Sequence, residues 1–130
     1  MYMSLKAMIK TEVNGNLTIH MKGGLNFENT EPLKKELATM LSQNPAQNIT
    51  LDMYGLDFVG SSGISYFVDT IKLLNTEKAR IKLKNVKTEF LRVFKLYDFD
   101  ALSLIEDQFD DDETMELNQK FGNRSKTFQN

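Results

Sequence analysis

The chain has 130 residues, a net charge of −2 and no cysteine, which predicts one domain whose core is large enough to fold without disulfides or metals. Without cysteine, disulfide frameworks, thiolate metal sites and cysteine nucleophiles are excluded, and a cytoplasmic location is expected. The balanced charge argues against binding to nucleic acids. No apolar run is long enough for a membrane span, so no membrane insertion is expected.

The first elements predicted along the chain form a β-hairpin. One strand is expected over about 5–13 and a second over 17–21, because Asn14-Gly15 between them tolerates the positive φ of a tight turn. Apolar and polar residues alternate along the second strand, so its side chains divide between two faces. The expected apolar face consists of Leu17, Ile19 and Met21.

A first helix is predicted to follow, capped at Asn29 or Thr30 and ended by Asn44-Pro45. Beyond it, strands and helices alternate: a strand over 48–53, a helix opened by residues 61–63, a strand over 79–83, a helix over 86–97 and a last strand over 102–105. The order β-β-α-β-α-β-α, with a final β, predicts an α/β fold in which helices pack on a mixed β-sheet.

The composition changes after Ile105. We place the domain at residues 5–106 and interpret 107–130 as an acidic and polar C-terminal tail, expected to be mobile. A solvated tail without a role is the simpler interpretation of such a charge run. A helical extension or interaction arm is the alternative, because Met115, Leu117 and Phe121 are apolar.

No catalytic site is predicted. His20 is the one histidine, lies on a predicted strand facing away from the core, and has no partner at metal-ligand spacing. Residues 60–63, Gly-Ser-Ser-Gly, do not have the Gly-x-Ser-x-Gly spacing of a hydrolase nucleophile. We therefore expect no enzyme activity, no metal and no cofactor.

The strand–helix junction around Ser61 and Ser62 could serve a different purpose. A hydroxyl at a helix start can cap free N–H groups, which stabilises by about 1 kcal/mol. A phosphate at the same place would meet those N–H groups and the positive end of the helix dipole. Phosphorylation would add about −1.5 to −2 charges and could expel a docked partner without unfolding the domain.

Three stretches of the sequence resemble the STAS domain, in the branch of bacterial anti-sigma factor antagonists. Residues 23–30 are similar to that family's Gly-x-Leu-Asp loop before the first helix, and residues 49–59 to its central strand and following loop. Gly60-Ser61-Ser62-Gly63-Ile64 resembles the Asp-Ser-Ser/Thr-Gly-Leu signature. The likeness covers about residues 8–105, and the family's order of elements is similar to the predicted one.

The resemblance implies a partner switch. Family members bind an anti-sigma factor that is also a serine kinase of the histidine-kinase-like ATPase fold, and this frees the sigma factor. The kinase phosphorylates the first serine of the signature, here Ser61, with Ser62 as the second choice, and a serine phosphatase resets the cycle. Gly60 and Asn26 stand where the family usually has acids, so this chain has less negative charge beside the serine.

The resemblance also implies a docking surface, made of the loop at 26–29, the junction at 58–62 and the start of the second helix. Phe58 has a second interpretation as a core residue. The alternative function is a STAS subunit that is not phosphorylated, in a lipid-transport or signalling assembly, with Ser61 serving as a helix cap. The expected partner-binding residues are Asn26, Phe27, Asn29, Phe58, Gly60, Ser61, Ser62 and Ser65.

Overall fold

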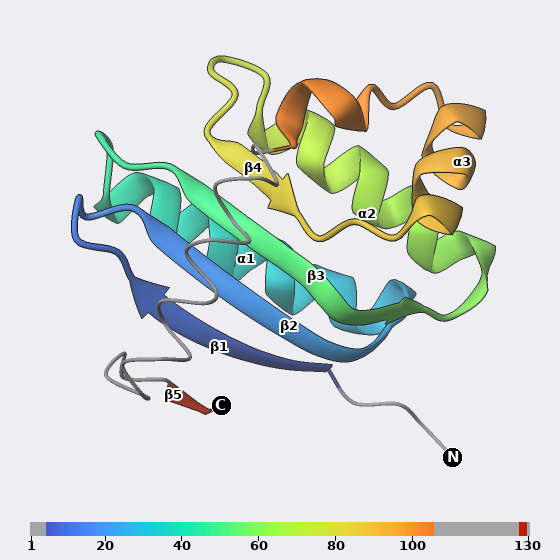
Figure 1. The fold of residues 1–130 in the computed structure, drawn as a ribbon, viewed down its shortest axis with the longest axis horizontal. Helices are drawn as coiled ribbons and strands as arrows, with labels where there is room; N and C mark the ends of the chain where they lie inside the picture. Colours follow the sequence, from blue (N-terminus) through green and yellow to red (C-terminus); the bar gives the residue numbers. More distant parts are fainter. Residues whose placement is uncertain (1–4, 106–127, 130) are drawn as a thin grey trace.

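The computed structural model describes residues 5–105 and 128–129. Strands and helices alternate along most of the chain, as the sequence predicts (Figure 1). In chain order the elements are β1 (Leu5–Thr11), β2 (Leu17–Leu25), α1 (Phe27–Gln43), β3 (Ile49–Phe58), α2 (Gly60–Leu74), β4 (Ile81–Lys84), α3 (Thr88–Leu96), the 3-10 helix η1 (Ala101–Leu104) and β5 (Phe128–Gln129).

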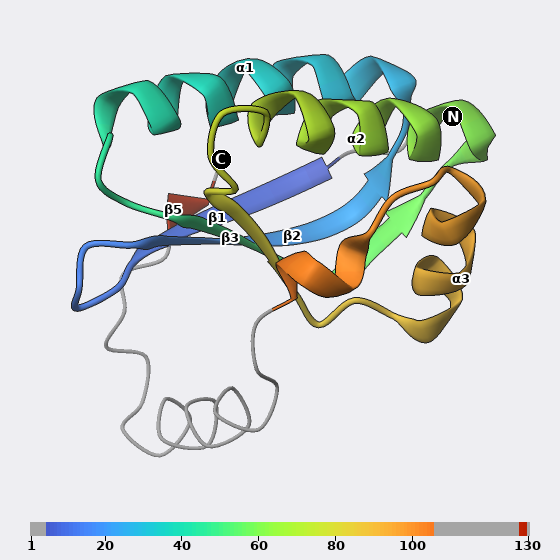
Figure 2. The same cartoon turned by 90° about the horizontal axis from the view of Figure 1, so that it is seen from above.

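The sheet is mixed, with the strand order β4-β3-β2-β1-β5. The β1–β2 hairpin is antiparallel, and so is the short pairing of β5 with β1. β2, β3 and β4 are parallel neighbours, joined by crossovers through α1 and α2. Since both crossovers step in the same direction across the sheet, they place both helices on one face, which Figure 2 shows. The predicted fold class, a mixed sheet with helices packed on it, is confirmed.

The core lies between this face of the sheet and the two helices. Leu17, Ile19 and Met21 of β2 are at most 8% exposed, which confirms the predicted apolar face of that strand. On the helix side, Leu37 of α1 and Phe67 of α2 are fully buried. The core continues toward α3 and η1 through a cluster of aromatic rings: Phe58, Phe67, Phe90, Phe94 and Phe99.

Two sequence-based predictions about element ends are wrong. α1 is capped by Asn26, three residues before Asn29, the first of the two predicted caps, so the helix begins at Phe27. The predicted last strand over 102–105 is mostly the 3-10 helix η1, and only Ile105 makes an isolated bridge, parallel to Leu83. The predicted tail at 107–130 lies outside the described residues, apart from Phe128–Gln129 in β5.

Candidate functional site

The start of α1 and the start of α2 lie at the same end of the sheet, where β2 and β3 end (Figure 2). Gly63 makes their close approach possible: a Cβ atom at this position would lie 2.8 Å from the Leu25 carbonyl oxygen and 3.2 Å from the Asn26 Cα. The Val59 N–H donates to the same Leu25 carbonyl at 2.9 Å. The turn after β2 and the turn after β3 are therefore joined by a hydrogen bond and packed closely against each other.

Side chains close the start of α1. The Asn29 N–H donates to Asn26 Oδ1 and the Asn26 N–H donates to Asn29 Oδ1, both at 2.8 Å, which forms a reciprocal capping box. Asn29 Nδ2 donates to the Gly24 carbonyl at 2.8 Å, and the Thr30 hydroxyl donates to the Asn26 carbonyl at 2.6 Å. Two of the predicted partner-binding side chains, Asn26 and Asn29, thus hold the helix start together.

The start of α2 is left open. Its N-cap residue is Val59, no side chain caps the helix, and its first turn contains no acidic residue. Gly60 takes a positive φ of 79°, a conformation that favours glycine. Ser61 and Ser62 follow in the first turn, and both are exposed. The free N–H groups and the positive end of the α2 dipole therefore meet solvent beside two accessible hydroxyls.

An aromatic pair, the exposed Phe27 and the half-buried Tyr66, lies beside this open helix start. The Phe27 ring, 55% exposed, is 4.7 Å from the Tyr66 ring, measured between centroids. The Tyr66 hydroxyl donates to the Glu31 carboxylate, and Lys34 Nζ lies 5.9 Å from the Tyr66 ring centre. Phe27 and Tyr66 bridge α1 and α2, so they give the two helix starts a shared apolar surface that a partner can contact.

The other predicted site residues have structural contacts of their own. The half-buried Phe58 ring lies 4.8 Å from the Phe90 ring and 5.4 Å from the Phe67 ring, so it joins the aromatic part of the core. The Ser65 hydroxyl donates to the Ser62 carbonyl at 3.3 Å. The structure therefore brings the predicted residues to one end of the molecule, where Phe27, Gly60, Ser61 and Ser62 are the exposed ones.

A polar network on the opposite face of the sheet was not foreseen. His20 Nδ1 lies 2.6 Å from Asp52 Oδ2, and Asp52 Oδ1 accepts from Asn85 Nδ2 at 2.9 Å and from the Tyr54 N–H at 3.0 Å. Burial raises the pKa of the Asp52 carboxyl, but the bonds from His20, Asn85 and Tyr54 outweigh burial and leave the pKa below 3.8. Only the parallel pairing of β2 with β3 brings His20 opposite Asp52.

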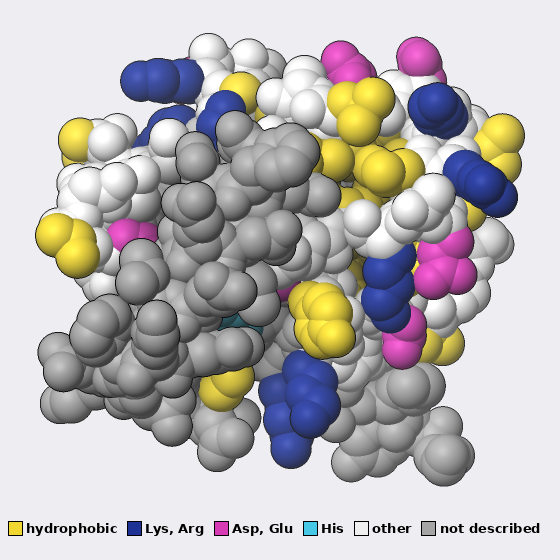
Figure 3. All heavy atoms as spheres, in the orientation of Figure 1, with side chains coloured by type: hydrophobic (Ala, Val, Ile, Leu, Met, Phe, Trp, Pro, Cys, Tyr) yellow, Lys and Arg dark blue, Asp and Glu magenta, His cyan; other side chains and the backbone are white. Residues whose placement is uncertain are grey.

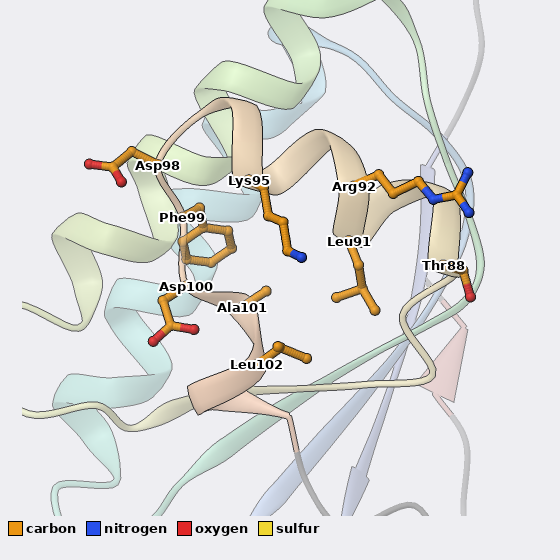
Figure 4. Close-up of a pocket in the computed structure, with 9 residues that line it drawn as sticks. All are labelled: Thr88, Leu91, Arg92, Lys95, Asp98, Phe99, Asp100, Ala101 and Leu102. Atoms are coloured by element: carbon orange, nitrogen blue, oxygen red, sulfur yellow. The ribbon is translucent and has the colours of Figure 1, made fainter.

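A hollow of about 510 Å³ lies between α3 and η1, away from the two helix starts. Figure 4 shows Arg92 and Lys95 on its α3 side and Asp100 and Phe99 on the other. None of the predicted site residues lines it.

Among the described residues, no group of three or more histidine, aspartate or glutamate side chains could hold a metal ion. Among the same residues, no helix is long and apolar enough to cross a membrane.

Comparison with known proteins places this arrangement in a family. The sequence profile of the STAS domain matches residues 7–112. The fold is similar to that of the phosphorylated Bacillus cell fate determinant SpoIIAA, at 17% identity and a TM-score of 0.59, over 86% of this chain and 99% of that one. It is also similar to the unphosphorylated anti-sigma factor antagonist SpoIIAA, at 17% identity and a TM-score of 0.57, over 85% and 96% of the two chains.

A third similarity is to the murine anion transporter Slc26a9, at 14% identity and a TM-score of 0.51. It covers 69% of this chain and 18% of the transporter. No curated protein sequence matches this chain.

Proposed function

This chain belongs to the STAS domain family, and from that premise we propose that it is an anti-sigma factor antagonist that acts as a partner switch. Its partner is an anti-sigma factor that is also a serine kinase of the histidine-kinase-like ATPase fold. The unphosphorylated chain holds this kinase, and phosphorylation of Ser61 releases it until a serine phosphatase removes the phosphate. The chain itself works by binding and not by catalysis.

The observation that carries the proposal is the open start of α2. Ser61 is exposed in the first turn of a helix that has neither a side-chain cap nor an acid there. A phosphate on this hydroxyl would lie near unsatisfied N–H groups and the positive end of the dipole, so the fold would tolerate it. The added charge would fall within the docking surface and oppose an acidic or apolar partner surface.

The proposed docking surface centres on the exposed residues Phe27, Ser61 and Ser62, with Ser65 one turn further along α2. Beside them, the half-buried Asn26 and Asn29 cap the start of α1, and the half-buried Phe58 packs into the aromatic part of the core. Gly60, which precedes Ser61, is also exposed. Asp57, the nearest preceding acid in the chain, is paired with Lys87 at 3.0 Å. With Gly60 in the position before Ser61, the phosphate would thus bring the first negative charge to the first turn of α2.

Intact-mass measurement of the chain purified from its own host tests the modification. We expect a species heavier by one phosphate, and fragmentation should place it on Ser61. In Ser61→Ala the heavier species should disappear, whereas the matched variant Ser62→Ala should retain it. Absence of phosphate under every growth condition would instead support the alternative, a STAS subunit with a constitutive binding role and Ser61 unmodified.

Binding to the kinase tests the switch. Ser61→Asp should weaken the affinity at least tenfold while the free energy of unfolding stays within about 1 kcal/mol of the wild type, because the helix dipole accepts the charge. Ser42→Asp is the matched control, since it adds the same charge at an exposed position in the last turn of α1, outside the docking surface, and should leave the affinity unchanged. Unchanged affinity in Ser61→Asp would contradict the mechanism.

A further inference from the structure

The sheet face opposite α1 and α2 carries a concentration of lysines. The register places Lys6 beside Lys22, Lys82 beside Thr50 and Lys84 beside Asp52, all pointing away from the helices. Figure 3 views the molecule from this side, where Lys or Arg, Asp or Glu and hydrophobic side chains are all visible. We call this surface the lysine face; its lysines are Lys6, Lys10, Lys22, Lys82 and Lys84.

The charge of the lysine face differs in sign from that of the helical face. By register its five lysines share this side with three acids, Glu12, Asp52 and Asp57, which gives a net charge of +2 with His20 neutral. Lys10 and Glu12 form an ion pair at 3.6 Å, and Asp52 is bonded to His20. On the helical side, α1 and α2 together carry three lysines and four acids, a net charge of −1.

Short side chains at the centre of the lysine face are withdrawn from solvent. Thr18 and Thr50 are each 5% exposed and Asp52 is 8% exposed, although none of the described helices packs on this side. By contrast, Tyr54 toward the end of the same face is 75% exposed. The middle of this face is therefore less accessible than its end.

The residues on either side of segment 106–127, Ile105 and Phe128, lie at opposite edges of this sheet. Ile105 bridges to Leu83 of β4, and Phe128 pairs with Ile9 of β1. Five inter-strand spacings separate them, a distance of about 24 Å. The 22 residues between can extend to about 70 Å, so they reach across with length to spare.

The charge of residues 106–127 complements the lysine face. The segment contains seven acids, all within 106–116, and three basic residues, all within 117–127, for a net charge of −4. The acidic half follows directly after Ile105, next to the strand that carries Lys82 and Lys84. A path over α1 and α2 would be longer and would bring the acids against a surface of the same sign.

We propose that the lysine face is a docking surface for the chain's own segment 106–127, with the acidic half over the lysines of β4 and β2. The starts of α1 and α2 lie on the other side of the sheet, so this second surface is independent of the proposed switch at Ser61.

Zero-length carbodiimide cross-linking of the full chain, followed by peptide mass spectrometry, tests the proposal. We expect carboxylates of 106–116 to join Lys22, Lys82 and Lys84, with yields at least fivefold above those to the helical lysines, which serve as the internal control. Raising the salt from 10 mM to 1 M shortens the screening length from about 30 Å to about 3 Å and should reduce these products. The control lysines are Lys34, Lys35 and Lys72.

Cross-links mainly to the helical lysines, or evenly to both sets, would overturn the proposal. Cross-links between two copies of the chain would also overturn it, and a mixture of ¹⁴N- and ¹⁵N-labelled protein identifies them, because their products carry both isotopes.

Lysine acetylation gives a second test, which does not depend on the reactivity of the acids. Acetylation of the lysine face should become at least threefold faster when Asp110, Asp111, Asp112 and Glu113 are changed to Asn, Asn, Asn and Gln. Acetylation of Lys34 and Lys72 should not change, and equal rates on the lysine face in both proteins would contradict the docking.

Discussion

The two helix starts at the end of the sheet make a natural comparison, because they lie side by side and are built differently. At α1, Asn26 and Asn29 exchange hydrogen bonds with each other's N–H groups, and Thr30 adds another. At α2, Val59 offers no side-chain cap, and Ser61 and Ser62 are exposed beyond a glycine of positive φ. One helix start is satisfied from within the chain, whereas the other faces solvent unsatisfied.

The difference shows that the start of α1 is built for stability, whereas the start of α2 leaves its N–H groups accessible to a ligand or a modification. A capping box stabilises a helix but uses the N–H groups that a phosphate would need. Leaving α2 uncapped forgoes about 1 kcal/mol and preserves those groups. The fold tolerates this because α2 is held by burial of Phe67, Val68 and Ile71.

The largest expected effect comes from separating the two helix starts. In Gly63→Val the new side chain would clash with the Leu25 carbonyl, which lies 2.8 Å from the position of a Cβ. We expect a loss of about 3 kcal/mol in the free energy of unfolding, measured by urea denaturation. The matched variant Ser62→Ala in the same turn should change it by less than about 0.5 kcal/mol. A stable Gly63→Val protein would show that the close approach is unnecessary.

A variant that weakens the sheet without touching either helix start sharpens the comparison. Asp52→Asn removes the charge-assisted bond from His20 and should cost about 2 kcal/mol at pH 7. Kinase affinity measured at a temperature where the variant stays folded should be unchanged. Loss of affinity here would mean that binding follows stability and not the state of the α2 start.

The same residue gives a pH dependence of defined sign. The pKa of Asp52 is lower in the folded chain than its ordinary value of 3.8, so the unfolded chain binds the proton more tightly. Its contribution is complete well above pH 3.8 and is lost as the pH falls through the folded pKa. We expect the stability difference between the wild type and Asp52→Asn to shrink in that acidic range. A difference that stays constant down to pH 2 would contradict this assignment.

Truncating a side chain at each helix start compares the two directly. Asn26→Ala removes a cap acceptor that the Asn29 N–H uses at 2.8 Å and should cost about 1 kcal/mol. Ser61→Ala removes a hydroxyl that caps nothing and should change the stability by less than about 0.5 kcal/mol. Thermal unfolding at one pH and salt concentration measures both. Equal costs would remove the distinction between a closed and an open start.

The sequence predicted the fold class because apolar periodicity reports which face of each element is buried. Leu17, Ile19 and Met21 alternate as a half-buried strand should, and the structure buries them. The secondary structure of residues 102–105 was harder to predict. Residues 102–105 include three apolar side chains in four positions, a pattern that a strand and a short 3-10 turn share.

Features that depend on neighbouring residues in the sequence were predictable. Features that depend on how two strands pair were not. Ser61 and Ser62 stand out from local sequence alone, beside a glycine at a strand–helix junction. Local sequence favours a cap at Asn29 or Thr30, because both are common cap residues. In the structure Asn29 is the third residue of the helix and reaches back to the cap at Asn26. The His20–Asp52 contact joins residues 32 positions apart and requires the β2–β3 pairing.

The smallest expected effect is the most specific to an open helix start. Ser61→Asp places a carboxylate at the positive end of the α2 dipole and should stabilise the chain by about 0.5 kcal/mol at low salt. Ser42→Asp is the matched control in the last turn of α1, which has no basic residue, and it should destabilise by a similar amount. Both differences should shrink at 0.5 M salt, since screening weakens exposed charges. Chemical denaturation at the two salt concentrations measures the change in the free energy of unfolding, which should have opposite signs in the two variants. A loss of stability in Ser61→Asp would mean that the α2 start does not accept negative charge.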